Sequence, residues 1–149
     1  MMKLEDTIVI VASQGELKVY KIKKYEKTVR GELKTYYSLD LLNALDYIDA
    51  HKKLHEIVTD EAGRFKHEIN EEHELQNERK RRLIKEIAKD IDEIVAKLKP
   101  EQVFLAFNKE YNPKLMEYLS AETKKRIVKN VPADLVKIPK DKLLDHFLD

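Results

Sequence analysis

Residues 78–107, ERKRRLIKEIAKDIDEIVAKLKPEQVFLAF, combine an amphipathic helix pattern with an apolar strand pattern directly after it. The apolar positions of the first part recur every three or four residues, so one face of a helix over residues 78–98 is apolar. These positions are Leu83, Ile84, Ile87, Ala88, Ile91, Ile94, Val95 and Leu98. Pro100 ends the helix because proline lacks the amide hydrogen that a further turn needs. Residues 102–107 then predict a buried strand.

The segment before this helix predicts strands. Residues 7–12 are β-branched and apolar, which is typical of a central strand with both faces buried. A turn over residues 13–16 leads to a second strand over residues 17–24, and the two form an antiparallel hairpin. Residues 32–39 predict a third strand. Residues 40–56 are expected to contain a helix, because their apolar residues have helical spacing: Leu41, Leu42, Leu45 and Ile48.

The segment after residues 102–107 predicts short elements. Asn112-Pro113 favours a helix that ends at Leu119, with Asn112 as its N-cap and proline at the first helical position. Ser120 is expected to cap the next short helix, and residues 126–131 predict a strand. Pro139 begins a last helix, whose inner side carries Leu143, Leu144 and Phe147.

This order of elements predicts a single α/β domain over residues 1–149. The N-terminal antiparallel hairpin and a parallel βαβ half would share one mixed sheet flanked by helices. Residues 66–77 are mostly polar, which is typical of either a frayed helix or a mobile connector.

The composition excludes several classes of protein. The 149 residues include 29 basic and 28 acidic ones, and the charged share of 38% exceeds the usual share of roughly 25%. No apolar stretch approaches the roughly 20 residues of a membrane-spanning helix, and no secretory signal pattern is present. The periodic apolar blocks exclude a wholly disordered chain. The absence of cysteine excludes disulfides and favours a cytoplasmic protein.

Residues 51–64 contain the candidates for a metal or anion site. His51 and His55 would share one face of a helix and could bind a transition metal, with solvent-exposed histidines as the favoured alternative. Asp60, Gly63 and Arg64 suit a turn in which the guanidinium binds a phosphate or carboxylate. The alternative is an ion pair between Asp60 and Arg64 that only stabilises the loop. No metal or cofactor is therefore predicted, and Asp60 and Arg64 are weak catalytic candidates.

Two basic clusters favour an anionic partner. They are Arg79, Lys80, Arg81 and Arg82 at the start of the predicted long helix, and Lys124, Lys125 and Arg126. Positive charge at a helix start opposes the helix dipole, so a partner such as RNA or the ribosome would explain it. The alternative is ion pairs with the acidic tract just upstream of the first cluster, around residues 68–78. The loop after residues 102–107, with Asn108 and Lys109, lies where α/β folds bind ligands.

Motifs of common enzymes are absent from the chain. It has three glycines and contains no GxxxxGK loop, no GxGxxG loop and no GxSxG elbow. Asp90, Asp92 and Glu93 are expected on the exposed side of the long helix, where they solvate the helix rather than catalyse a reaction.

Five short segments follow one another as they do in a known family. Residues 58–65, VTDEAGRF, resemble the segment LVSDRPGRF, and residues 103–107 occupy the place of a strand LVLVAPP. Residues 11–20 resemble an opening hairpin VANxxxARVF, residues 115–128 a stretch LLRAxLSPxLRxxVV, and residues 133–147 an ending KDLTHLP with HL. The chain thereby resembles the bacterial host-attachment family, whose members are described as required for attachment to host cells.

This family is similar to the central domain of archaeo-eukaryotic peptide-chain release factors. That likeness implies an α/β domain with a mixed sheet and flanking helices, in agreement with the order of elements above. Release factors use a Gly-Gly-Gln motif for peptidyl-tRNA hydrolysis, and this chain has no such motif. The resemblance therefore implies the fold without that reaction.

Three functions follow as hypotheses. The first is a non-enzymatic cytoplasmic protein that binds RNA or a ribosome-associated partner through its basic clusters. The second is a hydrolase with Asp60 and Arg64 beside the loop after residues 102–107. The third is a protein-interaction module that acts through the long helix over residues 78–98.

Overall fold

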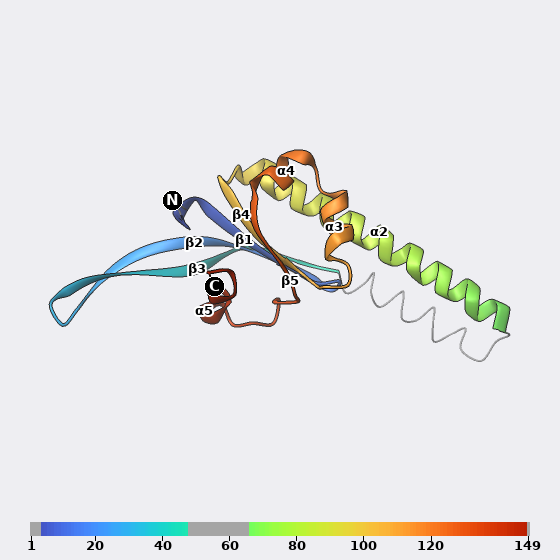
Figure 1. The fold of residues 1–149 in the computed structure, drawn as a ribbon, viewed down its shortest axis with the longest axis horizontal. Helices are drawn as coiled ribbons and strands as arrows, with labels where there is room; N and C mark the ends of the chain where they lie inside the picture. Colours follow the sequence, from blue (N-terminus) through green and yellow to red (C-terminus); the bar gives the residue numbers. More distant parts are fainter. Residues whose placement is uncertain (1–3, 48–65, 149) are drawn as a thin grey trace.

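The computed structural model describes residues 4–47 and 66–148, which fold around a five-stranded mixed sheet (Figure 1). Its strands are β1 (Thr7–Ala12), β2 (Glu16–Val29), β3 (Glu32–Asp46), β4 (Gln102–Phe107) and β5 (Ile127–Pro132). They lie in the order β3-β2-β1-β4-β5. β1 is antiparallel to β2 and parallel to β4, and β5 is parallel to β4. The predicted α/β fold, an antiparallel hairpin joined to a parallel half in one sheet, is confirmed.

The central strands β1 and β4 are buried on both faces, because helices cover the sheet from both sides. All of β1 and every residue of β4 after Gln102 are buried. Ile8 and Ile10 pack on the face covered by the long helix, whereas Val9 packs on the face covered by the C-terminal helices. Strands in this position need apolar side chains on both faces, which is the pattern of residues 7–12.

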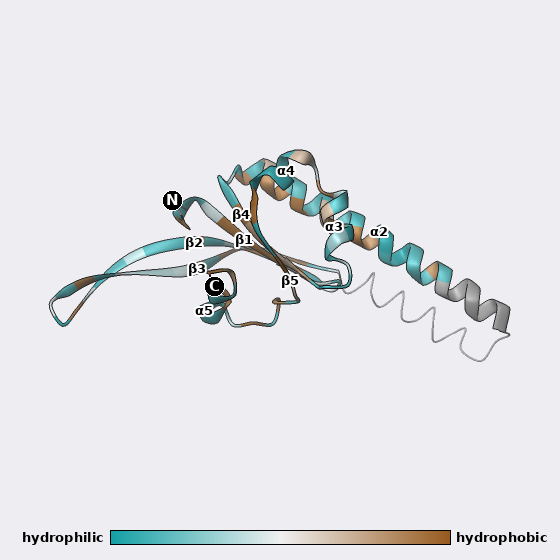
Figure 2. Ribbon diagram, viewed as in Figure 1, coloured by the Kyte–Doolittle hydropathy of each residue, from teal (hydrophilic) through white to brown (hydrophobic). Residues whose placement is uncertain are grey.

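The long helix α2 (Lys66–Leu98) lies over one face of the sheet and continues past its edge (Figure 1). Its apolar stripe is confirmed, although Leu98 is 41% exposed. The buried members are Leu83, Ile84, Ile87, Ala88, Ile91 and Val95. Figure 2 shows hydrophobic residues where α2 covers the sheet and mostly hydrophilic ones farther out. The helix begins at Lys66 rather than near residue 78, so the polar residues 66–77 are helical.

The predicted helix over residues 40–56 is wrong for residues 40–46, which continue β3. In β3, Leu41 pairs with Tyr20 and Asn43 with Val19, so Leu42 is an extra residue at a β-bulge. A bulge interrupts the alternation of side chains along a strand. The resulting leucine spacing imitates that of a helix. The remainder of the predicted helix lies outside the described residues.

β2 and β3 are both longer than predicted and form a two-stranded arm that projects beyond the rest of the sheet (Figure 1). Arg30 and Gly31 join them in a two-residue turn, with φ of 54° and 79°. Positive φ at both positions is typical of the type I′ turn, whose twist matches the twist of the two strands. We refer to residues 23–38 as the arm.

The short helices are α3 (Asn112–Tyr118), α4 (Ala121–Arg126), α5 (Lys140–Leu143) and α6 (Asp145–Leu148), and a 3-10 turn η1 (Leu4–Asp6) precedes β1. The Ser120 cap is confirmed, since its Oγ accepts a hydrogen bond from the Thr123 amide. The Asn112 cap is wrong, because Tyr111 occupies the N-cap position without a side-chain bond. Arg126 ends α4 instead of beginning β5.

The C-terminal helices cover the second face of the sheet. The apolar residues predicted for their inner side are buried there, as expected: Leu143, Leu144 and Phe147. The ring of Phe147 stacks on that of Phe104 in β4, with centroids 5.4 Å apart. Within residues 4–47 and 66–148, no helix has an apolar stretch that could cross a membrane.

Candidate functional site

A groove lies at the carboxyl end of β4, between α2 and the beginning of α3. It has a volume of about 360 Å³. The chain reverses direction between α2 and β4, so β4 runs back along α2. The loop that follows β4 therefore lies next to the first half of α2 (Figure 1). Its walls are Asn77, Lys80, Arg81, Ile84, Glu110, Tyr111, Pro113 and Lys114. Open α/β sheets bind ligands outside the carboxyl ends of their strands, and this groove occupies that position.

The α2 wall is one face of the helix. Asn77, Lys80, Arg81 and Ile84 follow the spacing i, i+3, i+4, i+7, which places them on one side. Ile84 is buried at the bottom, Lys80 is half-buried and Arg81 is exposed. The helix therefore presents two cations above an apolar floor.

The opposite wall is held by hydrogen bonds of two asparagines. The Oδ1 of Asn108 accepts from the Tyr111 amide at 3.1 Å, and its carbonyl accepts from the Asn112 amide at 2.9 Å. The buried Asn112 side chain exchanges two hydrogen bonds of 2.8 Å with Asn130 of β5 and donates to the Phe107 carbonyl at 3.4 Å. These bonds hold Tyr111 at the edge of the groove. The local sequence, Asn112 before a proline, predicts a helix cap instead of this role.

The groove carries a net positive charge. Lys80, Arg81 and Lys114 line it with one acidic residue, Glu110. Lys114 forms an exposed ion pair with Glu117 at 3.6 Å. In the part of the chain that the structure describes, Lys80 and Arg81 have no ion-pair partner.

An aromatic ring lies beside these charges. The Nζ of Lys80 is 5.9 Å from the centroid of the Tyr111 ring, within the range of a cation–π interaction. The ring is half-buried. Two cations without ion-pair partners next to such a ring can bind a phosphate and an adjacent planar group.

The members of the first predicted basic cluster lie on different faces of α2. Lys80 and Arg81 line the groove, whereas Arg82 forms an i,i+4 ion pair with Glu78. That pair is the contact with the upstream acidic tract that the alternative hypothesis expected. Arg79 is half-buried outside the groove lining. The prediction that residues 79–82 oppose the helix dipole is wrong. The dipole acts only near the first turn of a helix, and α2 begins at Lys66.

The predicted loop residues have different roles at the groove. Asn108 accepts a hydrogen bond that holds the loop, and it is not part of the groove lining. Lys109 is exposed beside Glu110 and is not part of the lining.

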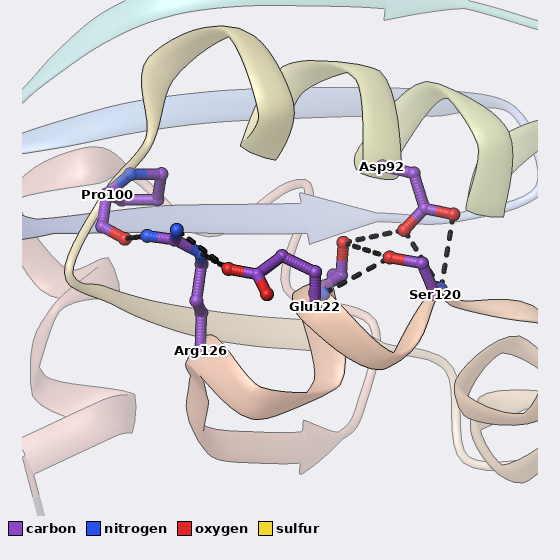
Figure 3. A network of polar contacts seen from close by, with 6 residues as sticks. Asp92, Pro100, Ser120, Glu122 and Arg126 are labelled. Atoms are coloured by element: carbon purple, nitrogen blue, oxygen red, sulfur yellow. Dashed lines mark hydrogen bonds and ion pairs between the residues drawn. The ribbon is translucent and has the colours of Figure 1, made fainter.

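The second basic cluster lies elsewhere, on α4. Arg126 donates from Nη1 to the Pro100 carbonyl and from Nε to Glu122 at 3.0 Å, which joins α4 to the end of α2 (Figure 3). Lys124 and Lys125 are exposed. α4 contacts α2 at Asp92, and along the helix Asp92 is about 18 Å from Lys80. The structure therefore separates this cluster from the groove.

Two acidic residues of α2 are structural acceptors rather than solvated side chains. The Asp92 carboxylate accepts from the Ser120 amide at 3.1 and 3.2 Å and from the Thr123 hydroxyl at 2.6 Å (Figure 3). Asp90 accepts from the Tyr47 hydroxyl. Both aspartates are half-buried, so the prediction that they only solvate the helix is wrong; Glu93 is exposed as expected.

Tyr47 joins the end of β3 to α2. Its ring is buried, and its amide donates to the Gly15 carbonyl at 2.7 Å. Burial, the hydrogen bond to Asp90 and the charges of Asp90 and Glu86 raise the pKa of Tyr47 well above its usual value. Nothing local in the sequence distinguishes this tyrosine from the six others.

The candidates for metal binding and catalysis lie outside the described residues. These are His51, His55, Asp60, Gly63 and Arg64. Among residues that the structure does describe, no group of three or more His, Asp or Glu side chains could hold a metal ion.

The fold and the groove define a class: a mixed α/β domain with a cationic groove at the carboxyl end of a parallel strand. The chain belongs to the family described as "Protein required for attachment to host cells", whose family model matches residues 8–147. This match confirms the family resemblance seen in the sequence. No curated protein matches the chain.

Proposed function

We propose that this protein binds RNA through the groove between α2 and α3, as a non-enzymatic binding protein of the cytoplasm. One observation carries the proposal: Lys80 and Arg81, without ion-pair partners among the described residues, lie beside the Tyr111 ring at the carboxyl end of β4. Cations bind phosphates, and aromatic rings stack on bases exposed in unpaired RNA.

The ribosome is the proposed source of this RNA. The resemblance of the family to the central domain of release factors supports this choice, and so does the mixed sheet with helices on both faces. The chain lacks the Gly-Gly-Gln motif of release factors, which supports binding without peptidyl-tRNA hydrolysis. Attachment to host cells would then be an indirect consequence of a role in translation.

The charge of the groove makes a quantitative expectation possible. Each cation that no longer binds a phosphate reduces the slope of log K against log salt concentration by about 0.7 for single strands and about 0.9 for duplexes. Lys80→Ala combined with Arg81→Ala removes two such cations. The slope should therefore fall by about 1.4 to 1.8. The apolar floor at Ile84 stays intact.

The test is co-sedimentation with ribosomes and titration with a fragment of ribosomal RNA, each at several salt concentrations. The matched control is Lys140→Ala combined with Lys142→Ala, which removes two exposed cations from α5. Binding that weakens and loses salt dependence only in the groove variant supports the proposal. Equal losses in both variants would mean diffuse attraction to any basic surface, and no binding by the unmodified protein at low salt refutes it.

A further inference from the structure

The arm is a surface that the sheet does not need for its own core. Ile22 and Leu39 are the last buried residues of β2 and β3, with 1% and 2% exposure. Residues 23–28 and 30–37 are exposed. A two-stranded ribbon with both faces in water is marginally stable. Its length is therefore unexplained by packing in the part of the chain that the structure describes.

The base and the tip of the arm differ in charge compensation. At the base, Lys23 pairs with Asp40 at 3.8 Å and Lys24 with Glu5 at 3.4 Å. Toward the tip, Lys27, Arg30 and Lys34 have no ion-pair partner among the described residues. The arm as a whole has five basic and two acidic residues, a net charge of +3.

Two features of the tip oppose folding of the arm. Lys27 lies directly opposite Lys34 in the strand register, and like charges in that position destabilise a hairpin. Arg30 has a φ of 54°, a conformation that glycine or asparagine adopts more easily. An anionic partner on this surface would remove the repulsion between the two lysines.

The lysine pair shares a face with an aromatic pair. Tyr25 lies opposite Tyr36, and their rings stack with centroids 5.5 Å apart at an angle of 22°. Lys27 and Lys34 are each two residues along from these tyrosines, so the two pairs occupy the same face about 7 Å apart. The two tyrosine residues are 46% and 36% exposed. A stacking platform beside two cations fits a base and the phosphates next to it.

We propose that the arm binds unpaired nucleotides of RNA, with bases on Tyr25 and Tyr36 and phosphates on Lys27 and Lys34. This inference rests on the proposed RNA-binding function and adds a second contact surface. Ile8 pairs with Lys21, so the arm begins beyond the amino end of β1, whereas the groove lies at the carboxyl end of β4. In Figure 1 the arm extends to the left and α2 to the right.

The chemistry of this face favours RNA over two other partners. A membrane-binding face gathers residues such as Leu, Phe and Trp. The Tyr25 face instead has tyrosines and lysines, with Val29 and Glu32 nearest the turn, and the exposed Leu33 alternates to the other face. A second copy of the arm would bring the same positive charge, which repels.

Two variants separate RNA binding from stability of the arm. Lys27→Glu places opposite charges across the ribbon, facing Lys34, so the arm should fold at least as well as before. Tyr36→Leu keeps an apolar cross-strand contact with Tyr25 but removes one aromatic face. Lys142→Glu, an exposed charge reversal on α5, is the matched control.

The probe is a labelled single-stranded RNA of about 20 nucleotides, measured beside a fully paired duplex of the same length. Lys27→Glu and Tyr36→Leu should each weaken binding of the single strand about tenfold. The Tm should be unchanged or higher for Lys27→Glu and slightly lower for Tyr36→Leu, which loses the stacked ring pair. The control variant should bind like the unmodified protein. A larger loss for the single strand than for the duplex supports stacking of bases on the arm.

The other outcomes overturn the inference in distinguishable ways. Unchanged RNA affinity in both arm variants, with a loss in the Lys80 and Arg81 variant, refutes the arm contact and leaves the groove. No RNA binding by the unmodified protein refutes both. Arm variants that lose binding to anionic lipid vesicles but not to RNA would indicate a membrane surface. A change of mass in light scattering would indicate contact with a second copy.

Discussion

Removing one hydroxyl group from Tyr47 should change both the stability of this protein and the way that stability depends on pH. In Tyr47→Phe the buried ring is retained, but the hydrogen bond to Asp90 is removed. Hydrogen bonds to charged groups contribute about 1.5–3 kcal/mol. Because Asp90 is half-buried and water can reach it, the lower end applies. The free energy of unfolding should therefore fall by about 1.5 kcal/mol near neutral pH.

The pH dependence follows from the raised pKa of Tyr47. The unfolded chain releases the tyrosine proton near a pKa of about 10, whereas the folded chain retains it to higher pH. This contribution to stability is thus complete below about pH 10 and is lost as pH rises from there toward the folded-state pKa. By about pH 11 the unmodified protein should have lost about 1.4 kcal/mol that the phenylalanine variant does not lose.

Urea unfolding of both proteins at a series of pH values between about 7 and 11 tests this expectation. The two proteins differ in no other side chain, so the difference between the two curves isolates Tyr47. The difference in free energy of unfolding between the two proteins should decrease from about 1.5 kcal/mol at about pH 7 to nearly zero at about pH 11. Two parallel curves would show that Tyr47 does not hold its proton in the folded protein, and the role assigned to its hydrogen bond with Asp90 would then be wrong.

Four further predictions concern the core, α4, the turn of the arm and the groove. Ile91→Ala should lower the free energy of unfolding by about 2–5 kcal/mol, whereas Leu98→Ala, on the same helix but 41% exposed, should cost far less in the same urea titration. Asp92→Ala leaves the Ser120 amide and the Thr123 hydroxyl without their acceptor and should cost about 1–3 kcal/mol, with no loss if α4 is held by other contacts. Gly31→Ala meets no atom within 4 Å but forces alanine to a φ of 79°, so thermal unfolding should show a loss of roughly 1–2 kcal/mol. Tyr111→Ala should weaken RNA binding about tenfold while the salt slope stays constant, since it removes stacking and no charge; a changed slope would contradict this role.

An element could be predicted from the sequence where its pattern of burial is the same along its whole length. β1 and β4 have apolar residues on both faces because both faces are covered, and the stripe of α2 follows the period of a helix. β3 could not be predicted in full. Its bulge at Leu42 breaks the alternation, and this break is why the helix predicted over residues 40–56 is wrong for residues 40–46.

The candidate site could be predicted only in part, because the sequence shows which residues are basic but not which residues lie next to them. Basic clusters at residues 79–82 and 124–126 are visible in the chain, but their neighbours are not. Because of the helical geometry, Lys80 and Arg81 face the groove, whereas Arg82 lies next to Glu78 and pairs with it. The partners of Asp90 and Asp92 come from β3 and α4, which are distant in the sequence.

The family, the order of most elements and the amphipathic stripe of the long helix follow from the amino-acid sequence alone, because they depend on local periodicity and on short motifs. Three other features follow from tertiary contacts: which cations face a groove, which carboxylates are hydrogen-bonded and how far the arm projects. Those contacts join segments that meet when α2 packs back on the sheet and when β2 and β3 pair along their full length. A local pattern contains no information about such partners until the fold has placed them.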